Sequence, residues 1–223
     1  MQDPVFVQRA FSRIADRYVL TNHVLSMGTD ILWRRKVARL VKEFEPKRIL
    51  DLATGSGDLA AEILKKIPSV TIIGADFCQP MLAHARKRGL ENLIVADGLE
   101  LPFEDGAFDV VTVAFGLRNM ADWAAAVREM ARVLVPGGRL VILDFSIPPG
   151  ILRRPYRIYL HKGLPFMAGL LTGQKDAYAY LSESIERFPS GEGMCDLLRE
   201  NGFRSATADP LSFGIASVYV GER

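Results

Sequence analysis

The chain has few cysteines and no dominant charge of one sign. Its two cysteines, Cys78 and Cys195, lie far apart, with no CxxC pair or cysteine–histidine cluster around either. This spacing argues against a disulfide framework and against a metal site. A formal net charge of +2, without a basic stripe interleaved with aromatics, argues against a nucleic-acid partner.

Long apolar runs are also missing. No run reaches the roughly 18 residues that a membrane-spanning helix needs. The first residues, MQDPVFVQRAFSRIADRY, carry charges throughout and lack the apolar core of a signal peptide. We therefore expect a cytoplasmic protein that is either soluble or touches the inner face of a membrane only peripherally. With 49% hydrophobic and 24% charged residues, the chain can bury one good core, and we expect a single domain over residues 1–223.

What the sequence does have is a regular alternation of short apolar runs and helical stretches. RILDLA, VTIIGADF, NLIVAD, FDVVTVAFGL and RLVILDFS are typical of strands, and GDLAAEILKKI and DWAAAVREMARVLV of the helices between them. Nearly continuous apolar strands predict an α/β fold with a mostly parallel sheet and helices on both faces.

Other segments extend this pattern. We expect helices within residues 1–45 and a helical insertion at 151–187, after the fifth strand. VPGG at 135–138 predicts a turn before that strand. Two final strands, near RSATADP and FGIASVYVG and joined by Pro210 and a few residues, predict an antiparallel pair at one edge.

The stretch LDLATGSGDLA, residues 50–60, joins the first strand to a helix through a Gly-x-Gly turn. Its glycines also fit the loose dinucleotide fingerprint, so a nucleotide is the expected ligand. In an open parallel sheet the ligand binds beyond the carboxyl ends of the strands. The candidates delivered there are Asp51, Gly55, Ser56 and Gly57, then Asp76 and Phe77, then Asp97 and Gly98, and finally Arg118 and Asn119.

These strand ends suit the adenosine part of a cofactor, and their charges decide between NAD and S-adenosylmethionine. Asp76 stands about 20 residues past the turn, where a carboxylate accepts ribose hydroxyls. Phe77 can pack on adenine, and Asp97 can accept the adenine amino hydrogens while Gly98 leaves room for the ring. Asp51 and Asp97 would repel the two phosphates of NAD. S-adenosylmethionine instead brings a sulfonium, an ammonium and one carboxylate for a helix N-terminus, so it is the predicted cofactor.

With these motifs the chain resembles a class I methyltransferase, and more narrowly the ubiquinone/menaquinone biosynthesis C-methyltransferase family. The resemblance runs nearly end to end, through FSRIADRY, SMGTDILWRR, LDLATGSGDLA, LPFEDGAFDVVTVAFGLRNM, RVLVPGGRLVILDFS and YAYLSESIERFP. It implies a Rossmann-like class I methyltransferase sheet. It also implies methylation of a ring carbon of a prenylated quinol, such as demethylmenaquinol, in menaquinone or ubiquinone biosynthesis.

The resemblance also implies roles for single residues. It places the cofactor on Ser56, Asp76, Asp97, Gly98 and Ala114, the last of which stands where some members have serine. It places Tyr18 in an N-terminal lid. Arg118 is expected to stabilise the quinol phenolate, and Asn119 to orient the ring, a water or the cofactor. No conventional base stands out, and His23 and Tyr18 are the candidates.

The sequence departs from the family pattern near the acceptor. Val19 stands where an Asp is usual, and Asp30 and Tyr219 stand where His is common. None of these positions belongs to the glycine turn, so they bear on the exact substrate more than on the reaction class.

The segment ILRRPYRIYLHKGLPFMAGLL, residues 151–171, suits two partners equally. Its apolar side chains fall roughly on one helical face and its basic ones mostly on the other: Leu152, Tyr156, Tyr159, Leu160 and Met167 against Arg153, Arg154, Arg157 and Lys162. This face is expected either to meet a membrane peripherally or to cover the sheet or a second subunit of a homodimer.

Two other functions remain open from the sequence. One is a small-molecule methyltransferase of the same fold that acts on an oxygen or nitrogen nucleophile. The other is a protein that binds S-adenosylmethionine without catalysis.

Overall fold

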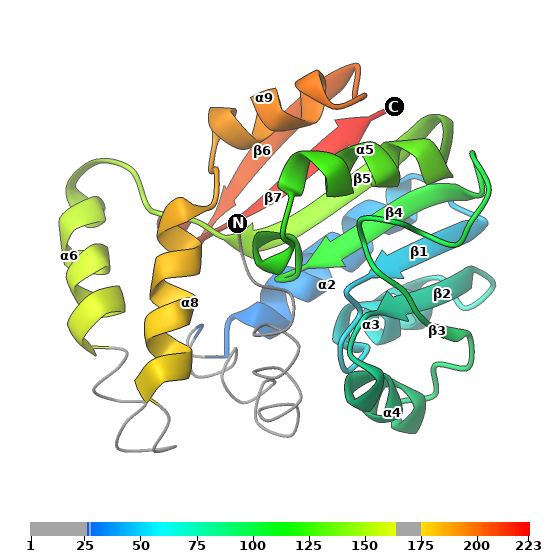
Figure 1. Ribbon diagram of the computed structural model, residues 1–223, viewed down its shortest axis with the longest axis horizontal. Helices are drawn as coiled ribbons and strands as arrows, with labels where there is room; N and C mark the ends of the chain where they lie inside the picture. Colours follow the sequence, from blue (N-terminus) through cyan, green and yellow to red (C-terminus); the bar gives the residue numbers. More distant parts are fainter. Residues whose placement is uncertain (1–25, 27, 164–174) are drawn as a thin grey trace.

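The computed structural model describes residues 26, 28–163 and 175–223 (Figure 1). Seven strands form one sheet in the order β3-β2-β1-β4-β5-β7-β6. Their bounds are β1 Arg48–Leu52, β2 Thr71–Asp76, β3 Leu93–Val95, β4 Phe108–Ala114, β5 Leu134–Phe145, β6 Ser205–Leu211 and β7 Ala216–Glu222. The first five strands run parallel, and β7 pairs antiparallel with both β5 and β6. The predicted mostly parallel sheet with an antiparallel pair at one edge is therefore confirmed.

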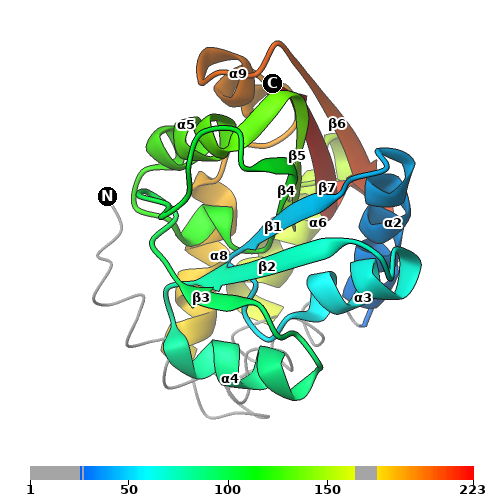
Figure 2. The same cartoon turned by 90° about the vertical axis from the view of Figure 1, so that its right-hand side faces the viewer.

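Helices cover both faces of this sheet (Figure 2). The longer ones are α2 Asp30–Glu43, α3 Asp58–Lys66, α4 Gln79–Lys87, α5 Trp123–Val133, α8 Lys175–Arg187 and α9 Glu192–Glu200. Alternate strand residues serve the two faces: Ile49 and Val110 pack with α2 and α3, whereas Leu50 and Val111 pack with α5 and α9. This alternation explains why the strands read as continuous apolar runs, since both faces are buried.

Strand order reverses beside β1, which lies between β2 and β4. A crevice forms at such a reversal because the connections from neighbouring strands leave to opposite faces of the sheet. The turn after β1 and the short helix η1 (Leu117–Asn119) after β4 lie at this point. The topology therefore brings together the predicted glycine turn and the segment that contains Arg118 and Asn119.

Two turns differ from the sequence-based expectation. VPGG lies inside β5, where the register of the ladder shifts: Leu134 pairs with Phe108, and the pairing resumes only where Arg139 pairs with Val110. Pro210 lies within β6 itself, an edge strand that tolerates a residue without an N–H. The short helix η4 (Ser212–Gly214) makes the connection to β7 instead.

The insertion after β5 contains the short helices η2 Gly150–Leu152, α6 Arg153–Ile158 and η3 Tyr159–Gly163, and later α8. Leu160 is fully buried, and its carbonyl accepts a hydrogen bond from the Ser182 hydroxyl of α8 at 2.6 Å. Leu160 therefore packs inward, whereas Leu152, on the same predicted apolar face, is 43% exposed. Of the helices that the structure describes, none is long and apolar enough to cross a membrane. Most of the predicted N-terminal lid, including Tyr18 and His23, lies outside the described residues.

Candidate active site

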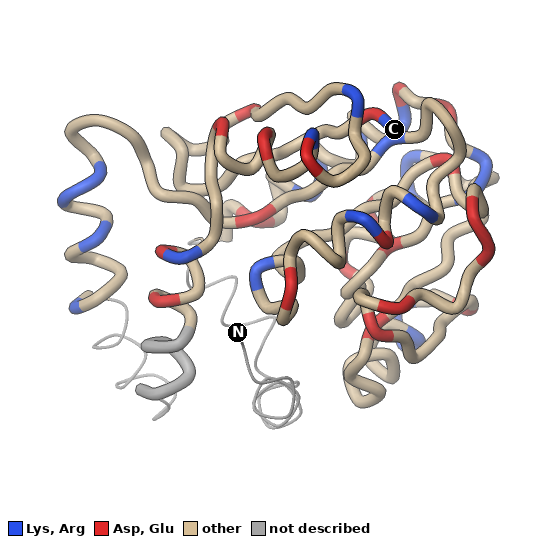
Figure 3. Tube along the Cα trace, turned by 45° about the horizontal axis from the view of Figure 1, so that its top comes forward, with Lys and Arg blue, Asp and Glu red and all other residues tan. Residues whose placement is uncertain are grey.

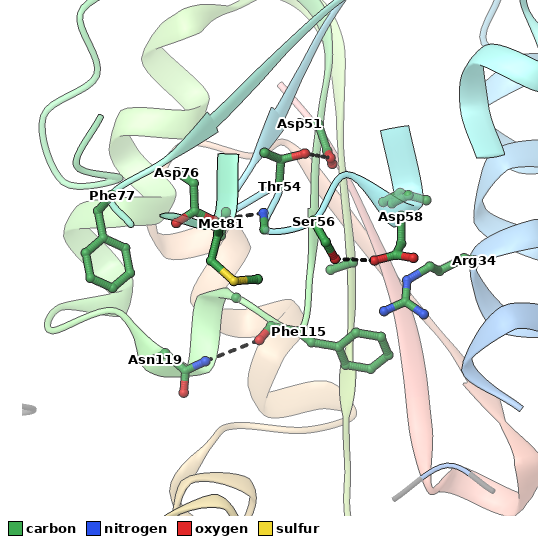
Figure 4. A pocket seen from close by; sticks show the side chains of 15 residues that line it. Arg34, Asp51, Thr54, Ser56, Asp58, Asp76, Phe77, Met81, Phe115 and Asn119 are labelled. Carbon is green, nitrogen blue, oxygen red and sulfur yellow. Dashed lines mark hydrogen bonds between the residues drawn. The ribbon is translucent and has the colours of Figure 1, made fainter. Parts of the chain in front are cut away.

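A hollow with two adjoining compartments opens at the carboxyl ends of β1, β2 and β4 (Figure 4). The polar compartment is lined chiefly by Arg34, Asp51, Thr54, Gly55, Ser56, Asp58, Ala114 and Phe115. The apolar compartment is lined chiefly by Leu52, Ala96, Asp97, Gly98, Leu99, Met120 and Ala121. Asp76, Phe77 and Asn119 line both. Most of the residues proposed from the sequence therefore meet at one place.

The glycine turn after β1 is tight, and its two glycines serve different purposes. Gly55 and Gly57 have φ values of +56° and +77°, a region that costs other residues steric strain. Gly55 lines the polar compartment. Gly57 does not; a Cβ there would lie 2.2 Å from Leu90 Cδ1. Gly57 permits close packing at the start of α3, and its predicted contact with the cofactor stays a prediction.

Asp51 is a buried carboxylate, 1% exposed, near the end of β1. Its two oxygens accept hydrogen bonds from the hydroxyls of Thr54 and Thr112, both at 2.6 Å. Burial raises the pKa of Asp51 to about 6, although both threonine bonds and the Arg34 charge act in the opposite direction. A cation placed in the polar compartment would favour the ionised form and be attracted by it.

Asp76 ends β2 where the two compartments meet. Its carboxylate accepts the backbone N–H of Gly55 at 2.8 Å and that of Cys78 at 2.9 Å, so it also ties the glycine turn to β2. Burial raises its pKa, and these two bonds oppose the shift. A carboxylate fixed in this way is suited to accept hydrogen bonds from the two hydroxyls of a ribose.

The apolar compartment contains Asp97 and Gly98, the two residues predicted to meet adenine. Gly98 packs closely on Met120, since a Cβ at position 98 would lie only 3.0 Å from Met120 Cε. Asp97 lines the same compartment and accepts the N–H of Leu99 at 2.9 Å, so its position is fixed by a turn. Phe77 lines both compartments, and its packing on adenine stays a prediction.

Arg118 lies apart from the lining of the hollow. Its side chain is 1% exposed, and Nη1 donates to Asp144 Oδ1 at 2.6 Å and to the Phe115 carbonyl at 2.8 Å. Its guanidinium therefore lines neither of the two compartments formed by the described residues. Its catalytic role stays a prediction. Asn119, by contrast, lines both compartments and donates to the same Phe115 carbonyl at 3.2 Å.

Sequence reasoning missed Arg34, Thr112 and Phe115. Arg34 reaches the polar compartment from α2, and its guanidinium lies 5.2 Å from the centre of the Phe115 ring. Phe115 has a left-handed φ of +59°, which no local sequence signal announces. The one available signal was the pair of arginines in LWRR, since a charged residue on the buried face of an amphipathic helix requires a partner.

The chain matches the ubiE/COQ5 methyltransferase family over residues 2–223. The chain belongs to this family.

Among its curated relatives is the demethylmenaquinone methyltransferase of Thermus thermophilus, 51% identical over 96% of this chain and 99% of the relative. The corresponding protein of Deinococcus radiodurans is 44% identical over 97% and 92%. The ubiquinone/menaquinone biosynthesis C-methyltransferase of Geobacter sulfurreducens is 42% identical over 97% and 88%. The chain is therefore an S-adenosylmethionine-dependent methyltransferase of quinone biosynthesis.

Solved structures confirm the fold. A SAM-dependent methyltransferase of Thermotoga maritima superposes with a TM-score of 0.69 at 21% identity, covering 97% of this chain and 99% of the other. The methyltransferase CalH, solved with SAH, gives 0.61 at 21% identity over 84% and 55%. The class I methyltransferase sheet expected from the sequence is thus confirmed.

Proposed function

We propose that this enzyme transfers a methyl group from S-adenosylmethionine to a ring carbon of demethylmenaquinol, as a single domain over residues 1–223. The observation that carries the proposal is the acidic glycine turn at the strand reversal, in a chain 51% identical to a demethylmenaquinone methyltransferase. Asp51 and Asp76 line the hollow where a dinucleotide would need to place its phosphates. A cationic donor without phosphates suits that environment.

The donor site is assigned from the lining of the two compartments. Adenine occupies the apolar compartment beside Asp97, Gly98 and Phe77, and the ribose bonds to Asp76. The amino-acid end enters the polar compartment, where Asp51, Gly55, Ser56 and Ala114 are available to it. The ribose is placed between adenine and the amino-acid end because Asp76 and Phe77 line both compartments.

S-adenosylmethionine supplies an electrophilic methyl group on a sulfonium, and the acceptor carbon must approach it in line. The protein contributes positioning and exclusion of water. A quinol carbon becomes nucleophilic when a neighbouring hydroxyl loses its proton. As the new carbon–carbon bond forms, the bond from sulfur to the methyl group breaks and S-adenosylhomocysteine is released, and the ring carbon then loses its own proton so that the ring is aromatic again. We assign Asn119, which lines both compartments, to orient the ring or a water at that hydroxyl. We assign Arg118 to stabilise the phenolate and Tyr18 to close the site.

We also propose a peripheral contact between the insertion and the inner face of a membrane, through residues 151–171. Of the apolar side chains expected to point outward, Leu152 is 43% exposed, but Leu160 is buried and Tyr156 and Tyr159 are partly buried. Ile151 and Ile158 are 92% and 61% exposed. Basic residues recur along α6 (Figure 3), and Arg157 directly precedes Ile158 in the sequence. Exposed apolar anchors with neighbouring arginines suit anionic lipid. The alternative partner for this face is a second subunit.

The reaction is tested with a methyl-labelled donor and two acceptors. The first acceptor is reduced demethylmenaquinone, and the second is a quinol already methylated at the ring carbon but with free hydroxyls. We expect label on the ring carbon of the first and no transfer to the second. Transfer to the second would instead indicate an O-methyltransferase, and donor binding without any transfer would indicate a binding protein.

A further inference from the structure

Arg34 occupies an unusual position for a charged residue. It lies on α2, far from the glycine turn in sequence, yet it lines the polar compartment and its side chain is only 8% exposed. In Figure 4 its guanidinium points toward the space between Asp58 and Phe115. A buried cation is costly unless a partner of opposite charge meets it.

One such partner is part of the protein. Asp30, fully buried one helical turn earlier, forms an ion pair with Arg34, and the Ser26 hydroxyl donates to the same carboxylate at 2.7 Å. The ring of Phe115 lies 5.2 Å from the guanidinium on another side. These contacts fix the direction of the side chain, so that Arg34 presents its charge to the compartment without reorganisation when a ligand arrives.

The charges around the polar compartment indicate which part of a ligand the Arg34 guanidinium would bind. Among the lining side chains that the structure describes, Arg34 is the one cation, whereas Asp51, Asp58 and Asp76 are acids. Asp58 forms an ion pair with a different arginine, since Arg88 Nη1 lies 3.0 Å from Asp58 Oδ1. The amino-acid end of S-adenosylmethionine carries both an ammonium and a carboxylate. The acids suit the ammonium, but they repel the carboxylate unless a positive group lies on its side of the compartment.

We infer that Arg34, held by Asp30, binds the carboxylate of the donor's amino-acid end, together with the backbone N–H groups at the start of α3. A guanidinium can form two parallel hydrogen bonds to a carboxylate, which fixes orientation as well as charge. The donor is thereby anchored at both ends, by Asp76 at the ribose and by Arg34 at the carboxylate. The inference rests on S-adenosylmethionine as the donor and not on the identity of the acceptor.

The test compares two ligands that differ in this carboxylate alone. S-adenosylhomocysteine carries it, and S-adenosyl-3-thiopropylamine lacks it but keeps the ammonium and the adenosine. Replacing Arg34 alone would leave Asp30 buried without its partner, so the main variant combines Asp30→Asn with Arg34→Met. The matched control is Arg35→Met, on the next residue of α2, whose side chain is 52% exposed and does not line the hollow.

Calorimetry on the double variant is expected to show S-adenosylhomocysteine affinity lowered roughly 10- to 100-fold, the range for one charged hydrogen-bonded contact. Affinity for S-adenosyl-3-thiopropylamine should change less than about threefold, and Arg35→Met should change neither. Equal losses for both ligands would make Arg34 a structural support and overturn the inference. An unchanged affinity for S-adenosylhomocysteine in the double variant would also overturn the inference.

Arg34→Lys provides the same comparison if the double variant fails to fold. It keeps the positive charge beside Asp30 but loses the planar fork. We expect a loss of about fivefold to tenfold for S-adenosylhomocysteine alone. No selective loss in this variant would also overturn the inference. Because neither measurement includes a quinol, failure here is distinguishable from failure of the proposed reaction.

Discussion

At the scale of single residues, Asp51 links donor binding to pH. Burial raises its pKa to about 6 from 3.8, so the folded protein binds its proton more tightly than the unfolded chain does. The contribution of Asp51 to stability is therefore largest below pH 3.8 and is lost as pH rises through about 6. Donor binding has the opposite dependence, because the ionised carboxylate is the form that attracts an ammonium or a sulfonium.

We predict that affinity for S-adenosylmethionine falls as pH is lowered through 6, by up to about tenfold per pH unit. In Asp51→Asn the affinity should be lower at neutral pH and should depend less on pH between 5 and 7 than in the wild type. Calorimetric titrations at several pH values would show this. A wild-type affinity that is constant over that range would contradict the assigned role of Asp51.

Asp76 provides a second prediction at this scale. Asp76→Ala should weaken S-adenosylmethionine binding by about 1–3 kcal/mol through the loss of charge-assisted bonds to the ribose. It should also lower stability, because the N–H groups of Gly55 and Cys78 lose their acceptor. Asp105→Ala is the control, since its carboxylate is 75% exposed and pairs only at the surface. Unchanged affinity in a folded Asp76→Ala protein would refute the ribose role.

The sequence predicted the residues of the hollow that lie at strand ends, but it missed Arg34 on α2. Asp76, Phe77, Asp97 and Gly98 lie on the hollow because strand ends in a parallel sheet converge, which the apolar pattern already implies. Arg34 lies there because of how α2 packs against α3 and the sheet. That packing joins residues far apart in the sequence, and no local motif reports it.

At the scale of elements, the turn between β4 and η1 depends on a buried ion pair. Burial raises the pKa of Asp144, and the charge of Arg118 and hydrogen bonds from Arg118 and the Phe145 N–H oppose that rise. Both Arg118 and Asn119 donate to the Phe115 carbonyl, so the pair positions residues that line the polar compartment. The sequence located LRN at the end of a strand, but only tertiary packing showed which way Arg118 points.

Two Arg118 variants separate structure from chemistry. Arg118→Ala should destabilise the protein by about 3–5 kcal/mol, because it strands a buried carboxylate. Arg118→Met combined with Asp144→Asn removes both charges, so this double variant should be much more stable than Arg118→Ala. If Arg118 stabilises the phenolate, this double variant should still lose roughly 100- to 1000-fold in single-turnover methyl transfer, with donor affinity retained. A normal single-turnover rate would remove Arg118 from the chemistry.

At the scale of the whole molecule, exposed apolar side chains gather at one end of the sheet. Phe213 in η4 is 84% exposed and has a left-handed φ of +61°. Gly214 packs so closely on Pro149 that a Cβ there would lie 3.0 Å from Pro149 Cδ, which places η4 beside the start of the insertion. Ile151 belongs to this same end. Such a surface is what a peripheral contact with lipid requires.

We predict that the protein binds vesicles containing anionic lipid and that binding weakens as salt rises, since surface charges are screened over roughly 8 Å at physiological ionic strength. Ile151→Ser with Ile158→Ser should reduce vesicle binding in a cosedimentation assay while leaving donor affinity unchanged. Val95→Ser, at an exposed strand end away from the insertion, is the matched control. Vesicle binding that is absent or unaffected by both salt and these changes would favour a second subunit on this face.

The measurement that tests the central claim most directly is quinone profiling in a host that lacks its own quinone C-methyltransferase. Expression of this chain should convert accumulated demethylmenaquinone to menaquinone, identified by the gain of one methyl group on the ring. Asp76→Ala should convert less at equal protein level. Persistence of demethylmenaquinone despite a folded protein that binds S-adenosylmethionine would contradict the proposed reaction.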